Sequence, residues 1–170
     1  GFPYLKLEAA ATPTKGIVLM SGEEQEKVCN SWKTYQSGNH RVVKFVPASG
    51  AASRMFKDLF AFLNGVNQEP ANDFEREFFD NIHDFAFFNE LNQKCEQNEG
   101  KSVDELMKGG DYKLIVDTLL NIRGLNYGQL PKGLLSFHKY DDGVRTPIEE
   151  HLVEAALYAA SNKQAYVHFT

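Results

Sequence analysis

The stretch KFVPASGAASRMFKD, residues 44–58, joins a short apolar run to a cluster of small residues and then to an arginine. The apolar run, residues 40–48, is rich in β-branched residues and closes at Pro47, so it predicts a strand. Residues 53–65 place Met55, Leu59 and Phe62 on one helical face before a glycine, which predicts a helix. The small residues therefore occupy a predicted strand-to-helix loop.

This loop, called the small-residue loop below, consists of Ala48, Ser49, Gly50, Ala51, Ala52 and Ser53. Backbone N–H groups at the start of a helix can hold an anion, and small side chains let a phosphate approach them. Arg54 follows directly and would add a charge-assisted hydrogen bond. The sequence is neither GxxxxGK[ST] nor GxGxxG. Two interpretations stay open: a phosphate-binding loop, or a turn in which small residues serve packing.

The remainder of the chain alternates helix and strand signals. Three capping boxes predict helix starts, the last with Pro147 at the first helical position: Ser21 with Glu24, Ser102 with Glu105, and Thr146 with Glu149. Apolar periodicity adds a long helix over 72–97 and another over 111–124, in which Ile122 is expected to face inward. Residues 133–140 and 164–170 predict strands, the first closed by a turn at Asp141–Asp142–Gly143.

This order predicts an α/β fold with a Rossmann-like, mostly parallel sheet and crossover helices. We expect parallel strands at about 41–47, 133–138 and 164–169, with a helix over 146–160 packed on them. Residues 1–170 would form one domain, and 58–129 a helical insertion within it. Ligand groups in such sheets come from loops beyond the strand ends, and no loop follows the last strand. The sequence therefore predicts the N-terminal portion of a longer protein.

Composition narrows the functional class. A net charge of −5 argues against a nucleic-acid partner, although a local cationic patch could still bind a nucleotide. Cys29 and Cys95 lack the spacing of a zinc site, and two unpaired thiols indicate a cytoplasmic protein. No apolar run approaches the roughly 20 residues of a membrane helix. The five histidines show no ligand spacing.

A second motif, PKGLLSF at residues 131–137, precedes TPIEEHL at 146–152. Together with PASGAASRM at 47–55, these motifs resemble the signature of the sugar-phosphate nucleotidyltransferases. The PKG triplet is closest to the branch that makes UDP-sugars of the N-acetylhexosamine type. The matching motifs cover residues 41–57 and 130–170. The whole chain also resembles the N-terminal region of an uncharacterised bacterial family classed as a domain of unknown function.

The resemblance implies a glycosyltransferase-A-like sheet that binds a nucleoside triphosphate and a sugar 1-phosphate. The small-residue loop would bind the nucleotide, and Arg54 and Lys132 would be the catalytic cations that neutralise its phosphates. Mg²⁺ is implied as well, held in the family by an Asp after a later strand, which here would lie beyond Thr170. Ala52 stands where the family has a second loop glycine, and residues 58–129 replace a short spacer.

Three functions follow from these observations. The chain could belong to an enzyme, it could bind a nucleotide without turnover, or it could be a structural domain that packs on the rest of the same polypeptide. An Asp after the next strand would favour the enzyme. One further surface has two interpretations, helical core or docking face, and is formed by Phe74, Phe78, Phe79, Phe85, Phe87 and Phe88.

Overall fold

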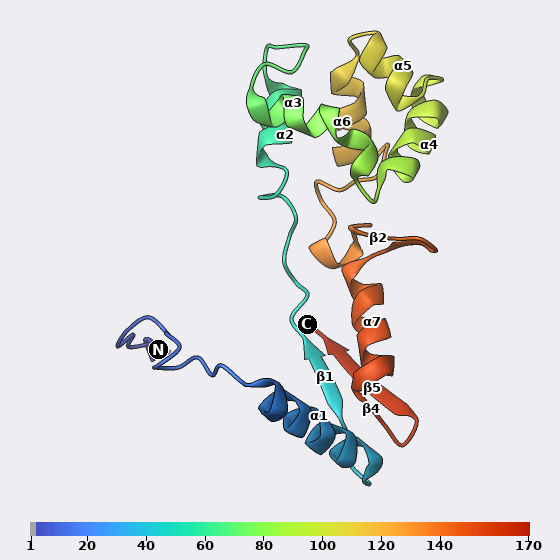
Figure 1. The fold of residues 1–170 in the computed structure, drawn as a ribbon. Coiled ribbons are helices and arrows are strands. Elements are labelled where there is room, and N and C mark those ends of the chain that lie inside the picture. The colour runs from blue at the N-terminus through green and yellow to red at the C-terminus, as the bar shows by residue number, and fades with distance from the viewer. Residues whose placement is uncertain (1–2) are drawn as a thin grey trace.

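The computed structural model describes residues 3–170, which form two groups of elements joined by two connecting segments (Figure 1). The sheet group contains β1 (Val43–Val46), α7 (Pro147–Tyr158), β4 (Ala160–Ser161) and β5 (Gln164–Phe169), with α1 (Gly22–Ser37) beside it. The helical group contains α2 (Lys57–Asn64), α3 (Asp73–Asp80), α4 (Phe88–Glu99), α5 (Val103–Lys108) and α6 (Tyr112–Leu120). The α/β class is therefore confirmed.

The main hydrophobic core lies in the helical group. α6 has the sequence YKLIVDTLL, whose apolar residues bury most of the helix against α2, α4 and α5. Ile115 and Leu119 are completely buried, as are Leu91 of α4 and Leu106 of α5. Burial of such side chains contributes about 1.5–3 kcal/mol each, which makes this packing the main source of stability.

The sheet group is held together by one strand pair between residues far apart in sequence, β1 and β5. β1 runs parallel to β5, with Val43 opposite Tyr166 and Val46 opposite Phe169. β4 and β5 form an antiparallel hairpin, so the strand order is β1-β5-β4. α7 packs beside β5, and its Glu154 accepts a hydrogen bond from Lys44 of β1. The predicted parallel pairing of 41–47 with 164–169 is confirmed.

The prediction of a Rossmann-like, mostly parallel sheet is wrong. Residues 133–138 do not join β1 and β5: a 3-10 turn, η2 (Lys132–Leu134), comes first, and β2 (His138–Tyr140) then pairs with β3 (Gly143–Arg145) in a separate hairpin. The cause is local turn chemistry. Asp141–Asp142 make a two-residue turn, and Gly143 takes a φ of +143° that favours glycine. The backbone of β2 therefore pairs with its immediate neighbour.

The predicted helix over 72–97 is also interrupted. α3 ends at Asp80, a 3-10 turn η1 (Ile82–Asp84) follows, and Phe85 is extended with φ −67° and ψ 139°. The break turns the Phe85 ring onto Phe78, at 5.3 Å between ring centroids, and onto Phe87 at 5.1 Å. Because one straight helix would spread the phenylalanines around its circumference, the interruption lets more of them reach the core.

The predicted helix over 111–124 ends early, at Leu120, and Ile122 is 76% exposed rather than inward. The chain turns back on itself so tightly that a Cβ at Gly124 would lie 1.7 Å from the carbonyl oxygen of Thr118. Only glycine fits there, so Gly124 marks the turn. The expected starts of the helices at Ser21, Ser102 and Thr146 are confirmed, each with both hydrogen bonds of its capping box.

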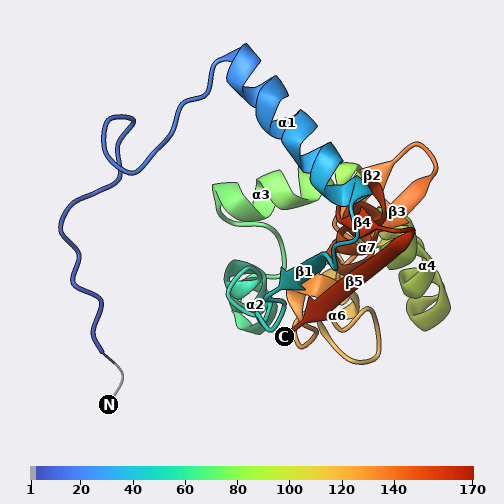
Figure 2. The same ribbon diagram turned by 90° about the horizontal axis from the view of Figure 1, so that it is seen from below.

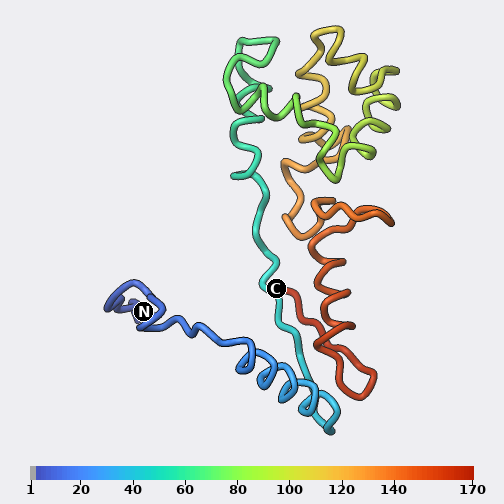
Figure 3. The backbone as a smooth tube through the Cα atoms, in the orientation of Figure 1, coloured from blue at the N-terminus to red at the C-terminus, as the bar shows by residue number. Residues whose placement is uncertain are grey.

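Two segments connect the helical group to the sheet group, residues 47–56 and residues 121–137, as the tube in Figure 3 shows. They are bonded to each other: Ala51 bridges Pro131, and the Lys132 N–H donates to the Gly50 carbonyl at 2.9 Å. The small-residue loop therefore lies beside the PKG triplet, although Arg54, which follows the loop, and Lys132 are 78 positions apart in sequence.

Residues 3–20 lie apart from both groups, whereas α1 is attached to the sheet group. Residues 3–20 run away from the body in an extended path that turns once near Thr12 and Lys15 (Figure 2). α1 buries none of its residues and is attached through Trp32, whose indole N–H donates to the Tyr158 carbonyl at 2.8 Å. Among residues 3–170 there is no helix whose length and apolar content suit a membrane crossing.

Candidate phosphate site

The small-residue loop is an extended connection rather than the N-terminus of a helix. α2 begins at Lys57, and its N-cap residue Phe56 makes no side-chain cap. Arg54 lies in the turn before this helix, not in its first turn as the sequence predicted. The turn is closed by the Met55 N–H, which donates to the Ala52 carbonyl at 2.8 Å. The small-residue loop and Arg54 therefore both precede the first turn of α2.

The residues of the loop have different environments. Ala52 is completely buried and belongs to the core of the helical group, so it serves packing. Ala51 carries the bridge to Pro131. Gly50 is exposed, and a Cβ built on it would meet no atom within 4 Å. The two interpretations of the loop thus apply to different parts of it: packing at 51–52 and open N–H groups at 49–50, since the Ala48 N–H already donates to the Thr170 carbonyl at 2.7 Å.

A pocket of about 180 Å³ lies where the loop, η2 and α7 meet. It is at the carboxyl end of β1, the position where parallel β/α units bind ligands. Its lining comes from three parts of the chain: Pro47, Ala48 and Gly50 from the 47–56 segment, Lys132 and Gly133 from η2, and Pro147, Ile148 and His151 from α7. We call it the phosphate pocket.

The groups of the pocket that favour an anion are Lys132 and the start of α7, and the His151 ring lies beside them. The Lys132 side chain is exposed and makes no hydrogen bond or ion pair with any residue between 3 and 170. The His151 Nδ1 lies 3.4 Å from Glu154. A helix N-terminus carries unsatisfied N–H groups and a partial positive charge, both of which favour an anion.

The capping box of α7 already uses two of the N–H groups at the start of this helix. Thr146 accepts from the Glu149 N–H, and the Glu149 carboxylate accepts from the Thr146 N–H at 2.7 Å. This backbone hydrogen bond lowers the pKa of Glu149, which therefore stays negative at the helix start. Pro147 has no N–H, so the Ile148 N–H is the donor that remains in the first turn. The site has few donors, and Lys132 carries most of its charge.

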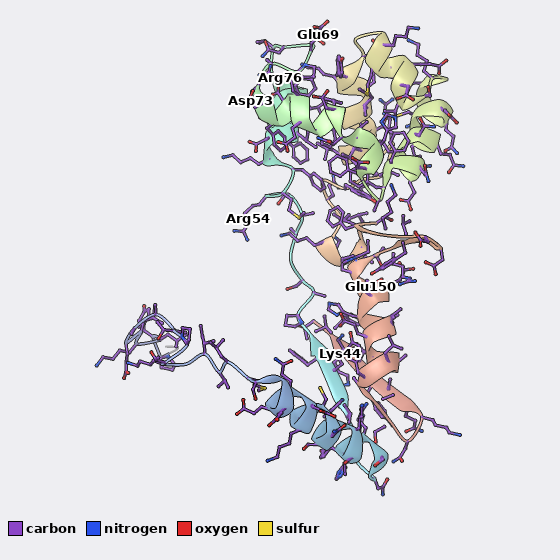
Figure 4. The ribbon with its side chains drawn as sticks, viewed as in Figure 1. Lys44, Arg54, Glu69, Asp73, Arg76 and Glu150 are labelled. Atoms are coloured by element: carbon purple, nitrogen blue, oxygen red, sulfur yellow. The ribbon has the colours of Figure 1, made fainter. Side chains whose placement is uncertain are left out.

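Arg54 does not line the phosphate pocket. Figure 4 shows its side chain projecting outward from the 47–56 segment, away from α7. Lys132 meets Ala48 and Gly50 as the sequence suggested, but the two predicted catalytic cations do not share a cleft. Sequence reasoning missed His151. His151 could have been found from its position four residues after Pro147, because residues four apart in a helix lie on one face and both line the pocket.

The carboxylates near the pocket do not suit the implied Mg²⁺. Glu149 is bonded to Thr146, Glu150 lies 3.1 Å from Arg145, and Glu154 is bonded to Lys44. Each is therefore engaged with an N–H or a cation rather than directed at a shared point. Within the described chain, no three His, Cys, Asp or Glu side chains gather as a metal centre would need.

The chain matches one protein-family model over residues 1–170, described as Domain of unknown function (DUF4301), and it belongs to that family. No curated protein and no solved structure matches the chain. Neither result links the chain to the nucleotidyltransferases.

Proposed function

We propose that this DUF4301 chain binds a phosphate group of a nucleotide in the phosphate pocket. The observation that carries the proposal is the meeting of exposed Gly50 backbone, unpaired Lys132 and the α7 N-terminus around one pocket of about 180 Å³. These are three kinds of group that bind phosphate: open backbone, a point cation and a helix start. They come from segments far apart in sequence, which the Lys132–Gly50 hydrogen bond and the packing of η2 on α7 bring together.

The proposal extends to a nucleoside triphosphate, and to nucleotidyl transfer in a longer polypeptide that contains this chain. An oxygen of a sugar 1-phosphate would attack the α-phosphorus, the bond from that phosphorus to the β-phosphate oxygen would break, and pyrophosphate would leave. Lys132 would neutralise phosphate oxygens, and Arg54 would need to turn inward to help. The support is the PASGAASRM and PKG resemblance together with the parallel β1–β5 pair.

Mg²⁺ belongs to this extended proposal, because phosphoryl-type transfers need positive charge on the oxygens of the transition state. Its ligands would lie outside residues 3–170, since the carboxylates beside the pocket are already engaged. Binding is thus assigned to the chain itself, and turnover only to the polypeptide that contains it.

A structural role for the loop is the second candidate. Three observations favour it: Ala52 is fully buried, Ala51 bridges Pro131, and the Lys132 N–H bonds the Gly50 carbonyl. These contacts would also be needed to hold two connecting segments together without any ligand. The two candidates differ in what they require of the Lys132 side chain, which contributes to phosphate binding only in the first.

Isothermal titration of the chain with pyrophosphate tests the proposal. Lys132→Ala should weaken binding about 10-fold, the equivalent of roughly 1.4 kcal/mol for a lost charge-assisted hydrogen bond. The melting temperature should not change, because the side chain is exposed and unpaired. Lys33→Ala, an exposed lysine on α1, is the matched control and should bind normally. Equal affinity in the wild type and Lys132→Ala would favour the structural role.

A further inference from the structure

The helical group contains a second hollow, of about 320 Å³, which we call the phenylalanine pocket. Its walls include six phenylalanines: Phe56, Phe74, Phe78, Phe85, Phe87 and Phe137. The deep part is formed by core residues, since Phe56, Phe78 and Phe87 are at most 7% exposed. Phe74 and Met55, which are 42% and 48% exposed, lie at the mouth.

The rings of this pocket hold one another in place. Phe85 stacks on Phe87 with 5.1 Å between centroids and 7° between planes, and it also lies 5.3 Å from Phe78. Phe56, from the 47–56 segment, contacts Phe137, from the 121–137 segment, with 6.5 Å between their ring centroids. Aromatic contacts of this kind stabilise a fixed arrangement. The hollow is therefore formed before any ligand enters, as most small-molecule sites are.

A neighbouring hollow of about 480 Å³ shares Phe74, Phe78 and Phe85 and adds two polar residues, Glu77 and Asn81. The Asn81 amide N–H donates to the Glu77 carbonyl at 2.8 Å, which leaves its amide oxygen as an acceptor. The Glu77 carboxylate has no ion pair with any residue in the described part of the chain. Its neighbour Arg76 bonds Asp73 instead, at 2.7 Å, on the same helix (Figure 4).

We propose that the two hollows together bind a small amphiphilic molecule with an apolar body and a cationic, hydrogen-bond-donating head. The phenylalanine pocket would take the body, and Glu77 and Asn81 the head. A dry cavity of about 150 Å³ holds one benzene ring, so about 320 Å³ suits a body on the order of a dozen carbon atoms. The head is cationic because the polar end includes the unpaired Glu77 carboxylate, and it donates hydrogen bonds because the Asn81 amide oxygen adds an acceptor beside it.

This site is separate from the phosphate pocket and shares no lining residue with it. Occupation of one therefore does not depend on the other, and a negative result with pyrophosphate leaves this proposal unaffected. The ligand class also differs. The phosphate pocket favours anions, whereas the Glu77 end repels them.

The test compares two ligands with the same two-ring body, 1-naphthylmethylamine, which is protonated at neutral pH, and neutral 1-naphthalenemethanol. Binding is followed by ligand fluorescence. Ala86→Trp fills the phenylalanine pocket and should weaken both ligands at least 10-fold. Glu77→Gln should weaken the amine about 2- to 5-fold, as for an exposed ion pair, and leave the alcohol unchanged.

Two further variants make the result independent of whether Ala86→Trp folds. Phe74→Ala removes a ring from the mouth and should weaken both ligands about 3-fold. Phe45→Ala removes a more exposed ring from β1, 63% exposed against 42% for Phe74, and should change neither. The proposal is overturned if the amine and the alcohol respond alike to Glu77→Gln, or if Phe45→Ala matters as much as Phe74→Ala. Self-association that Phe74→Ala abolishes would assign the hollows to a second copy of the chain instead.

Discussion

Replacing Gly50 by alanine separates the two roles of the small-residue loop. A Cβ at this position would meet no atom within 4 Å, and Gly50 is not among the glycines with positive φ. The folded protein therefore has room for the methyl group and needs no special backbone freedom at residue 50. If glycine is required there, the requirement comes from a molecule that approaches the backbone.

The expected effects on stability and on binding have opposite signs. Alanine restricts the unfolded chain, so a compatible Gly→Ala change stabilises a protein by about 0.4–1 kcal/mol, which raises the melting temperature by roughly 1–4 °C at this size. The same methyl group would stand between the Gly50 backbone and a phosphate in the pocket. Loss of one charge-assisted hydrogen bond, about 1.5–3 kcal/mol, should weaken pyrophosphate binding at least 10-fold.

Thermal unfolding and titration with pyrophosphate measure both quantities on the same samples. Gly22→Ala is the matched control, because a Cβ at Gly22 also meets no atom within 4 Å and lies on α1, far from the pocket. It should raise the melting temperature without affecting binding. A Gly50→Ala protein that binds pyrophosphate as tightly as the wild type would refute the role of this backbone. A clear loss of stability would refute the claim that the position is open.

Features encoded within a few residues could be predicted from the sequence. The capping boxes at Ser21, Ser102 and Thr146 depend on two side chains three positions apart, and each forms as expected. A fourth box, Asn72 with Glu75, follows the same rule and starts α3. The β1–β5 pair was also predicted, because both runs are apolar and a helix precedes the second.

Features set by competition between distant partners could not be predicted. Residues 133–140 read as a strand, but the sequence does not say whether this strand pairs with β1 or with its neighbour across the Asp141–Asp142 turn. The apolar run over 72–97 suits one long helix as well as two helices with a break. The break at Phe85 is decided by ring contacts with Phe78 and Phe87, which exist only in the folded core.

In the candidate site, too, the locally encoded features could be predicted and those set by distant contacts could not. The loop and Lys132 were found because small residues and a cation next to a strand are visible in sequence. The burial of Ala52 and the outward direction of Arg54 depend on where α2 starts, and no capping residue marks that start. His151 enters the pocket only because η2 packs on the first turn of α7, where a Cβ at Gly133 would come within 3.0 Å of Ile148.

Two further measurements test the core of the helical group and the contact between β1 and α7. Cys29 is exposed and Cys95 is buried, with burial raising the pKa of the Cys95 thiol, so a thiol reagent near neutral pH should label Cys29 rapidly and Cys95 only after unfolding. Equal rates for both cysteines would contradict the packing of α4 on α6. The hydrogen bond from Lys44 lowers the pKa of Glu154 below its usual 4.5. A carboxyl group whose pKa is lowered by folding contributes stability above its unfolded pKa and loses it as the pH falls through the lower, folded value. Lys44→Met should therefore reduce the free energy of unfolding at neutral pH, and the difference from the wild type should shrink as the pH falls below 4.5. Urea unfolding across this pH range measures the difference, and one that stays constant with pH would show that Lys44 stabilises the sheet group through its packing rather than its charge.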